Sequence, residues 1–158
     1  MTMFEHFSIE PLRIEACLIA ILCSFVIGLE RQWSGKPAGI RTSILICLGA
    51  YVFVATAVFY EPNVGAPRVL GQVVTGVGFL GAGVMLTKDG LVHGVTTASV
   101  IWILAAIGGL IGFGNYAAAV VLTFLTVVVV LGISLLEKAF NKLKSGAHGN
   151  NTAGSDLD

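Results

Sequence analysis

The sequence predicts an all-α protein, a polytopic transmembrane helical bundle of about five transmembrane helices. Its 158 residues are 56% hydrophobic and 11% charged, with a mean hydropathy of +0.90. A soluble domain carries roughly 25% charged residues, so this chain has too little polar surface to face water on all sides. The apolar residues also form several runs of membrane-spanning length, separated by polar connectors.

The first span is expected at residues 12–29, after an extracytoplasmic N-terminus of residues 1–11. Ala16 to Leu29 is uncharged. The N-terminus has no cluster of basic residues of the kind that opens a cleavable signal peptide, so the first apolar run is expected to stay in the membrane. A connector rich in Gly and Pro follows, and the second span is expected at residues 44–60.

The third span, residues 69–87, is rich in glycine. Gly78 and Ala82 stand one turn apart, a spacing that lets membrane helices pack closely, so we expect this helix at the centre of the bundle. Gly76, Gly78 and Gly81 also match the pattern GxGxxG. That pattern indicates a dinucleotide site only between a strand and a helix, a context that a membrane-length apolar run does not provide.

The next run, Gly94 to Leu136, contains no Asp, Glu, Lys or Arg. At ~1.5 Å per residue one helix of this length would be about twice as long as the ~30 Å hydrocarbon core, so the run must fold back. GFGNY at residues 112–116 is the natural break. We expect a fourth span at residues 94–111 and a fifth at 117–136, then a largely disordered cytoplasmic tail at 137–158.

Basic residues predict the orientation. An N-terminus outside the cell and a cytoplasmic C-terminus leave only Arg13 and Arg68 outside. This orientation, which follows the positive-inside rule, puts seven basic residues on the cytoplasmic side, namely Arg31, Lys36, Arg41, Lys88, Lys138, Lys142 and Lys144.

Four charged residues are expected to form a polar rim at the cytoplasmic side: Glu30, Arg31, Arg41 and Asp89. In one interpretation they anchor helix ends among the headgroups. In the other, Glu30 turns inward and pairs with Arg41. Asp89 fits a DG turn, and a second hypothesis is that it attracts a divalent cation.

A second group of candidates combines small and polar residues of the third and fourth spans. In lipid, such polar groups need partners on neighbouring helices or along a wet cavity. Trp102 is expected to pack against a glycine face. The group, expected to serve helix packing, oligomer contacts or the lining of a path, is Gln72, Thr75, Gly76, Gly78, Gly81, Gly83, Thr96, Thr97 and Trp102.

Several function classes are disfavoured. The formal net charge of +0 argues against nucleic-acid binding. Cys17, Cys23 and Cys47 have no metal-site or disulfide spacing and are expected to be small buried residues. The sequence has no acid pair, activated nucleophile or phosphate loop, so we expect no enzymatic activity and no catalytic residue. The sequence identifies no set of metal ligands.

Three blocks together resemble a known family: GLERQ with KPAGIRTSILICLGA, then QVVTGVGFLGAGVML, then HGVTTASVIWILAAIG. They are similar to the membrane domain of the MgtC/SapB family of bacterial inner-membrane proteins. The match runs from about Gly28 to Gly109. Many members carry a soluble C-terminal domain, whereas this chain is expected to end soon after its fifth helix.

The resemblance implies five membrane helices in the bacterial plasma membrane and a role in adaptation to low magnesium. It favours a non-enzymatic regulator of other membrane proteins. A transporter or channel for Mg²⁺ or another cation is the open alternative. The expected partners are the lipid bilayer, a second copy of the chain and other membrane proteins. No cofactor is expected, with Mg²⁺ as the one possible exception.

Overall fold

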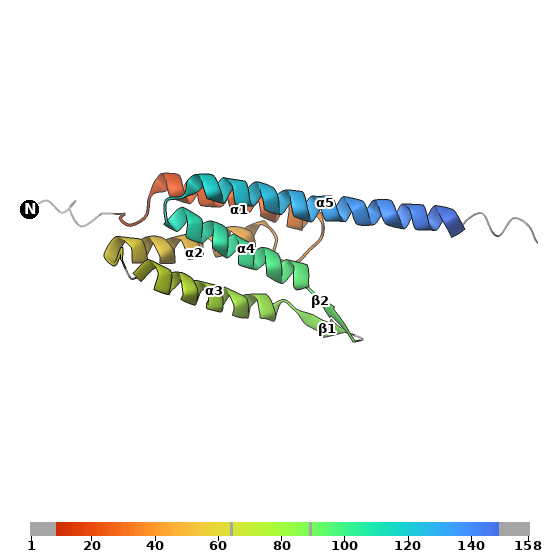
Figure 1. Cartoon of the computed structure of the whole chain (residues 1–158), viewed down its shortest axis with the longest axis horizontal. Coiled ribbons are helices and arrows are strands. Elements are labelled where there is room, and N and C mark those ends of the chain that lie inside the picture. Colours follow the sequence, from red (N-terminus) through yellow and green to blue (C-terminus); the bar gives the residue numbers. More distant parts are fainter. Residues whose placement is uncertain (1–8, 64, 89, 149–158) are drawn as a thin grey trace, which may run out of the picture.

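The computed structural model describes residues 9–63, 65–88 and 90–148, without the side chains of Lys88, Ser134 and residues 137–148. In these ranges the chain forms five helices that run along one common axis (Figure 1), which confirms the predicted all-α bundle. A short antiparallel hairpin joins the third helix to the fourth and pairs Leu86 with His93. The elements are α1 (Ile14–Trp33), α2 (Ile40–Tyr60), α3 (Gly65–Gly83), β1 (Leu86–Lys88), β2 (Leu91–His93), α4 (Val95–Gly112) and α5 (Tyr116–His148).

Within the described ranges, three helices are long and apolar enough to cross a membrane: α2, α4 and the segment Tyr116–Ile133 of α5. Helix α4 ends at Gly112 and α5 begins at Tyr116, in the segment where the sequence predicts a break. Two local features explain that break. Gly114 has a positive φ of 77°, which glycine adopts without strain. The side chain of Asn115 accepts a hydrogen bond from the backbone N–H of Ala118 at 3.2 Å and so caps the start of α5.

Helix α4 lies at the centre of the bundle and contacts α1, α2, α3 and α5. Its closest neighbour is α2, because glycines face that helix. A Cβ atom at Gly108 would overlap the carbonyl oxygen of Cys47, and one at Gly112 would lie 2.7 Å from Cβ of Val54. These glycines stand one turn apart, the small-xxx-small spacing that lets two backbones approach closely.

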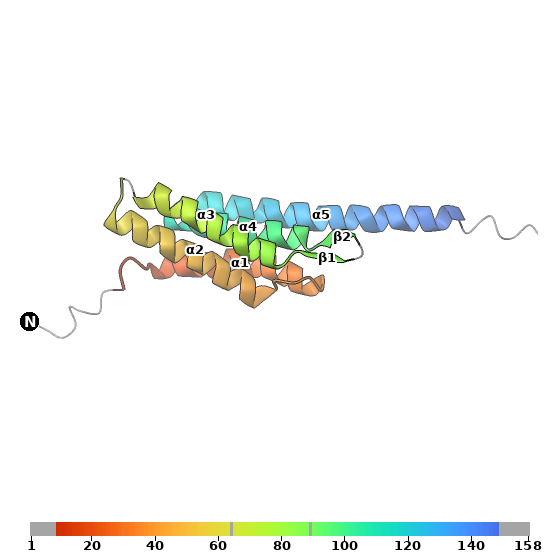
Figure 2. The ribbon, with the colours of Figure 1, turned by 90° about the horizontal axis from the view of Figure 1, so that it is seen from below.

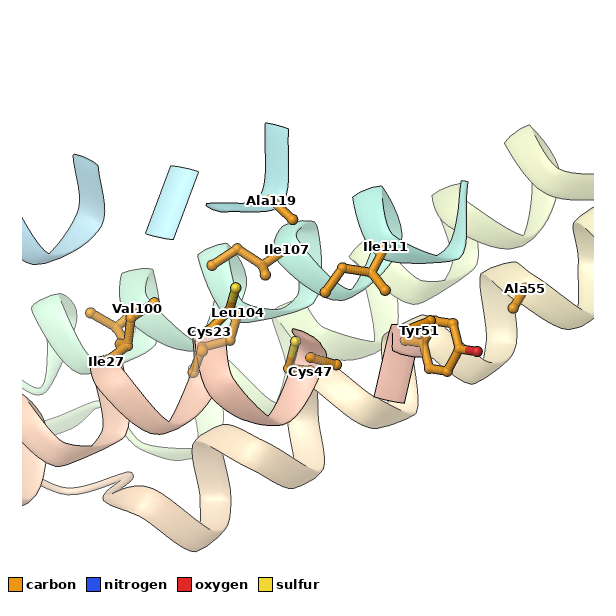
Figure 3. Close-up of a cluster of buried hydrophobic side chains, with 12 residues drawn as sticks. Cys23, Ile27, Cys47, Tyr51, Ala55, Val100, Leu104, Ile107, Ile111 and Ala119 are labelled. Carbon is orange, nitrogen blue, oxygen red and sulfur yellow. The ribbon is translucent and has the colours of Figure 1, made fainter. Parts of the chain in front are cut away.

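The main core cluster fills the space around this contact. Figure 3 shows Ile107 and Leu104 of α4 among side chains of the neighbouring helices. Tyr51 is 2% exposed, and its hydroxyl accepts a hydrogen bond from the backbone N–H of Arg13 at 2.9 Å. This bond fixes the start of α1 against the middle of α2.

Helix α3 lies at the edge of the bundle, so the expectation that it is the central helix is wrong. It packs against α2 and α4 (Figures 1 and 2), and four of its residues are buried: Gly65, Ala66, Val77 and Gly81. Its glycines are numerous but mostly face outward.

Several boundaries also differ from the expectation. Helix α1 continues to Trp33, α2 begins at Ile40 and α3 begins at Gly65, each four residues outside the expected span. Helix α3 ends at Gly83, and residues up to Thr87, which were expected in the third span, lead into the hairpin. Helix α5 continues to His148, well beyond the expected end of the fifth span at Leu136, and projects past the other helices (Figure 2). The expected disorder of the tail therefore does not apply to residues 137–148, and residues 149–158 lie outside the described part.

Candidate functional site

A buried cation is the most unusual polar feature of the bundle. Arg31, in the last turn of α1, is 2% exposed. Its Nη2 atom donates a hydrogen bond of 2.7 Å to Oγ1 of Thr97 in the first turn of α4. Its Nε atom is buried and has no hydrogen-bond partner among the described residues. Since arginine stays protonated in proteins, this contact holds a positive charge between α1 and α4.

The surrounding backbone explains why α1 and α2 lie close beside this cation. Gly28 comes one turn before Arg31 in α1, and a Cβ atom there would lie 2.7 Å from Cα of Ile40 and 3.0 Å from the Ser43 side chain. The bare surface of Gly28 lets the start of α2 approach α1. The two helices therefore meet closely at the end of the bundle where Arg31 reaches α4.

The other rim candidates lie apart from this contact. Glu30 is half-buried and its carboxylate accepts a hydrogen bond from Oγ of Ser34 at 2.8 Å. Arg41 is exposed, and among the described residues no ion pair joins it to Glu30. Asp89 lies outside the described residues. The structure therefore brings Arg31 and Thr97 together, whereas Glu30 accepts its hydrogen bond from Ser34, at the end of its own helix.

The polar candidates of α3 and α4 face the outside of the chain, with the exception of Thr97. Gln72 and Thr96 are exposed, and the exposed Thr75 donates a hydrogen bond to the carbonyl oxygen of Gly71 at 3.0 Å. The hydroxyl of Ser99 likewise donates a hydrogen bond to the carbonyl oxygen of Val95. Hydroxyls that bond back to their own helix need no partner from a second helix.

The candidate glycines of α3 divide into two groups. Gly81 faces α4, where a Cβ atom would lie 3.5 Å from that of Ala98. Gly76, Gly78 and Gly83 face open space, with no atom within 4 Å of a Cβ atom placed there. Trp102 is 52% exposed and lines a hollow of about 520 Å³ between α3 and α4, together with Gly78 and Gly81.

Metal ligands are sparse in the part of the chain that the structure describes. That part contains no group of three or more His, Cys, Asp or Glu side chains that could hold a metal ion. All three cysteines are free; Cys23 and Cys47 are buried in the core, and Cys17 is partly buried.

Comparison with known proteins identifies the family. The model of the MgtC family matches residues 17–139. This chain belongs to the MgtC family. MgtC-family proteins similar to it include "Protein MgtC" of Salmonella typhimurium (strain LT2), which is 38% identical over 134 residues, or 84% of this chain and 57% of the relative. The protein of Escherichia coli (strain K12) named "Putative magnesium transporter YhiD" is 38% identical over 150 residues, 87% of this chain and 69% of that relative.

The chain thus spans a little over half the length of the MgtC proteins that it matches. No solved structure matches it. The MgtC-family match includes Arg31 and Thr97 and the glycines at the contact of α2 with α4. Together with its apolar helices, this places the chain among membrane proteins.

Three glycines that allow close helix packing in this bundle were not predicted from the sequence: Gly28, Gly108 and Gly112. The last two form a GxxxG pattern within an apolar helix, which is a sequence signal for close helix packing. The burial of Arg31 had no comparable signal, because a charge at a helix end fits the headgroup layer equally well.

Proposed function

We propose that this chain acts in magnesium homeostasis of the bacterial inner membrane, as a non-enzymatic regulator of other membrane proteins. Membership of the MgtC family and the name of the Escherichia coli relative support the link to magnesium. The observation that carries the regulatory role is the outer face of α3.

Among the described residues, no other helix covers that face. Gly76 and Gly83 meet no atom there, and Phe79 between them is 79% exposed. Glycines that contact no helix of their own bundle still allow a helix from another chain to approach closely. The face therefore suits a membrane partner or a second copy of this chain, and we propose a homo-oligomer or a hetero-complex through it.

A cation transporter is the second candidate. Gln72, Thr75 and Thr96 lie on the outside, where they would line a path only between assembled copies. Within one bundle, the buried guanidinium of Arg31 would repel a cation that passes it. The placement of these polar groups makes transport dependent on assembly, whereas regulation through α3 needs one partner helix.

We also propose that all five helices cross the membrane, with the N-terminus outside and the C-terminus in the cytoplasm. The helix order supports this, because α1 begins and α5 ends at opposite ends of the bundle (Figure 1). A reporter fused after Asn63 should lie outside the cytoplasm, and one fused after His148 should lie in it. The opposite labelling pattern would overturn this orientation.

The regulatory role is tested with Gly83→Leu, which adds bulk to the outer face of α3, and with Phe79→Ala, which removes the exposed ring from the same face. The matched control is Gly132→Leu in α5, where a Cβ atom also meets nothing within 4 Å. In a deletion strain grown at low Mg²⁺, the α3 variants should lose rescue and partner capture while the control keeps both. Full rescue by all variants would refute docking through α3.

A further inference from the structure

A groove runs along the boundary between α2 and α3. It consists of two hollows of about 600 and 690 Å³ that share Phe53, Val69 and Gln72 in their walls. The lining surface of the first hollow is mostly apolar, and Leu45, Ile46 and Leu80 contribute to it. The groove exists because glycines line both walls: a Cβ atom at Gly49 of α2 or Gly76 of α3 would meet no atom within 4 Å.

The second hollow ends among polar side chains. Tyr60, Glu61 and Arg68 line it, and all three are exposed. No ion pair joins Glu61 to Arg68 within the described ranges, although both line the same hollow. One end of the groove therefore carries a carboxylate and a guanidinium that are not paired with each other.

Along α3, the chemistry of the wall changes in order. Arg68, Gln72, Gly76 and Leu80 follow one another at intervals of four residues, which places them in a row on one helix face. The row begins with the cation of Arg68 and continues with the amide of Gln72. It ends in an apolar surface formed by Gly76, which has no side chain, and Leu80. A phospholipid has the same order of groups: charged headgroup, ester carbonyls, acyl chain.

We propose that this groove binds a phospholipid whose headgroup carries a primary amine, with one acyl chain between α2 and α3. The phosphate lies at Arg68, which forms charge-assisted hydrogen bonds with its oxygens. The ammonium group lies at Glu61, and the amide of Gln72 donates to an ester carbonyl. The carboxylate of Glu61 and the guanidinium of Arg68 at this end of the groove favour phosphatidylethanolamine over a headgroup with no ammonium group. This inference requires that α3 lie in the membrane, and it does not depend on the regulatory role.

The test is native mass spectrometry of the purified protein with phosphatidylethanolamine, phosphatidylglycerol and phosphatidylcholine of identical acyl chains. The wild-type protein should retain phosphatidylethanolamine most tightly. Glu61→Gln should remove the preference for phosphatidylethanolamine over phosphatidylglycerol. Arg68→Gln should weaken all three lipids by about tenfold, as expected for the loss of a charge-assisted hydrogen bond.

Gly76→Leu fills the groove and should weaken retention of every lipid, whereas Gly132→Leu makes the same change on α5 and should retain lipid as the wild type does. The circular dichroism spectrum of each variant checks that it is folded. Equal retention of the three lipids by the wild type, or unchanged retention by Gly76→Leu, would overturn the proposal. If Gly76→Leu does not fold, an unchanged lipid preference in Glu61→Gln would still overturn it.

Discussion

The substitution Thr97→Val tests the role of the buried Arg31 directly. Valine has nearly the same shape as threonine, so the change removes the hydroxyl acceptor and leaves no cavity. Nη2 of Arg31 then loses its 2.7 Å hydrogen bond, in a side chain that is 2% exposed and whose Nε atom has no partner. A hydrogen bond to a charged group contributes about 1.5–3 kcal/mol. We expect the free energy of unfolding to fall by that amount.

The assay is equilibrium unfolding of the purified protein in mixed detergent micelles, followed by circular dichroism. Thr97→Ser keeps the hydroxyl and should lose only about 1 kcal/mol, for one buried methyl group. In Arg31→Met the cation is absent, so adding Thr97→Val to this variant should lower the free energy of unfolding only slightly. A loss in Thr97→Val no larger than in Thr97→Ser, or fully additive losses in the double variant, would refute the reasoning.

Three further predictions concern the backbone and the core, each measured by the same unfolding assay. Gly108→Ala should destabilise the protein by about 1–3 kcal/mol, because the added methyl group overlaps the backbone of α2. In the control Gly132→Ala the methyl group meets no atom, so the change should be neutral or stabilising. Equal changes in the free energy of unfolding for the two variants would contradict the close contact of α4 with α2. Gly94→Ala should cost more than Gly90→Ala, since both have a positive φ but only Gly94 is crowded, by the carbonyl group of Val84. Tyr51→Phe should cost about 0.5–1.5 kcal/mol through loss of the hydrogen bond from Arg13, and an unchanged stability would show that this bond is not needed.

The fold class was predictable because it depends on composition and on the lengths of apolar runs. The break at residues 112–116 follows from the same reasoning, since a charge-free run twice the thickness of the hydrocarbon core must turn. The position of α3 was not predictable in this way. Glycine count indicates that a helix has a bare surface, but whether that surface faces the bundle depends on the neighbours that the chain supplies.

The candidate site was predictable only in part. Arg31 and Thr97 were both candidates, yet sequence spacing gave no reason to pair residues from α1 and α4 that are 66 positions apart. Glu30 was expected either among headgroups or paired with Arg41. Instead it accepts a hydrogen bond from Ser34, four residues further along the chain. The packing role of Gly108 was available from its GxxxG spacing with Gly112.

Mg²⁺ flux into liposomes that contain the purified protein distinguishes a regulator from a transporter. We expect uptake equal to that of protein-free liposomes, with protein that remains folded by circular dichroism. Saturable uptake above that level, reduced by Gln72→Leu and by Gly78→Leu but unchanged by Gly132→Leu, would contradict the account. Such a result would establish the chain as a transporter whose path forms between assembled copies.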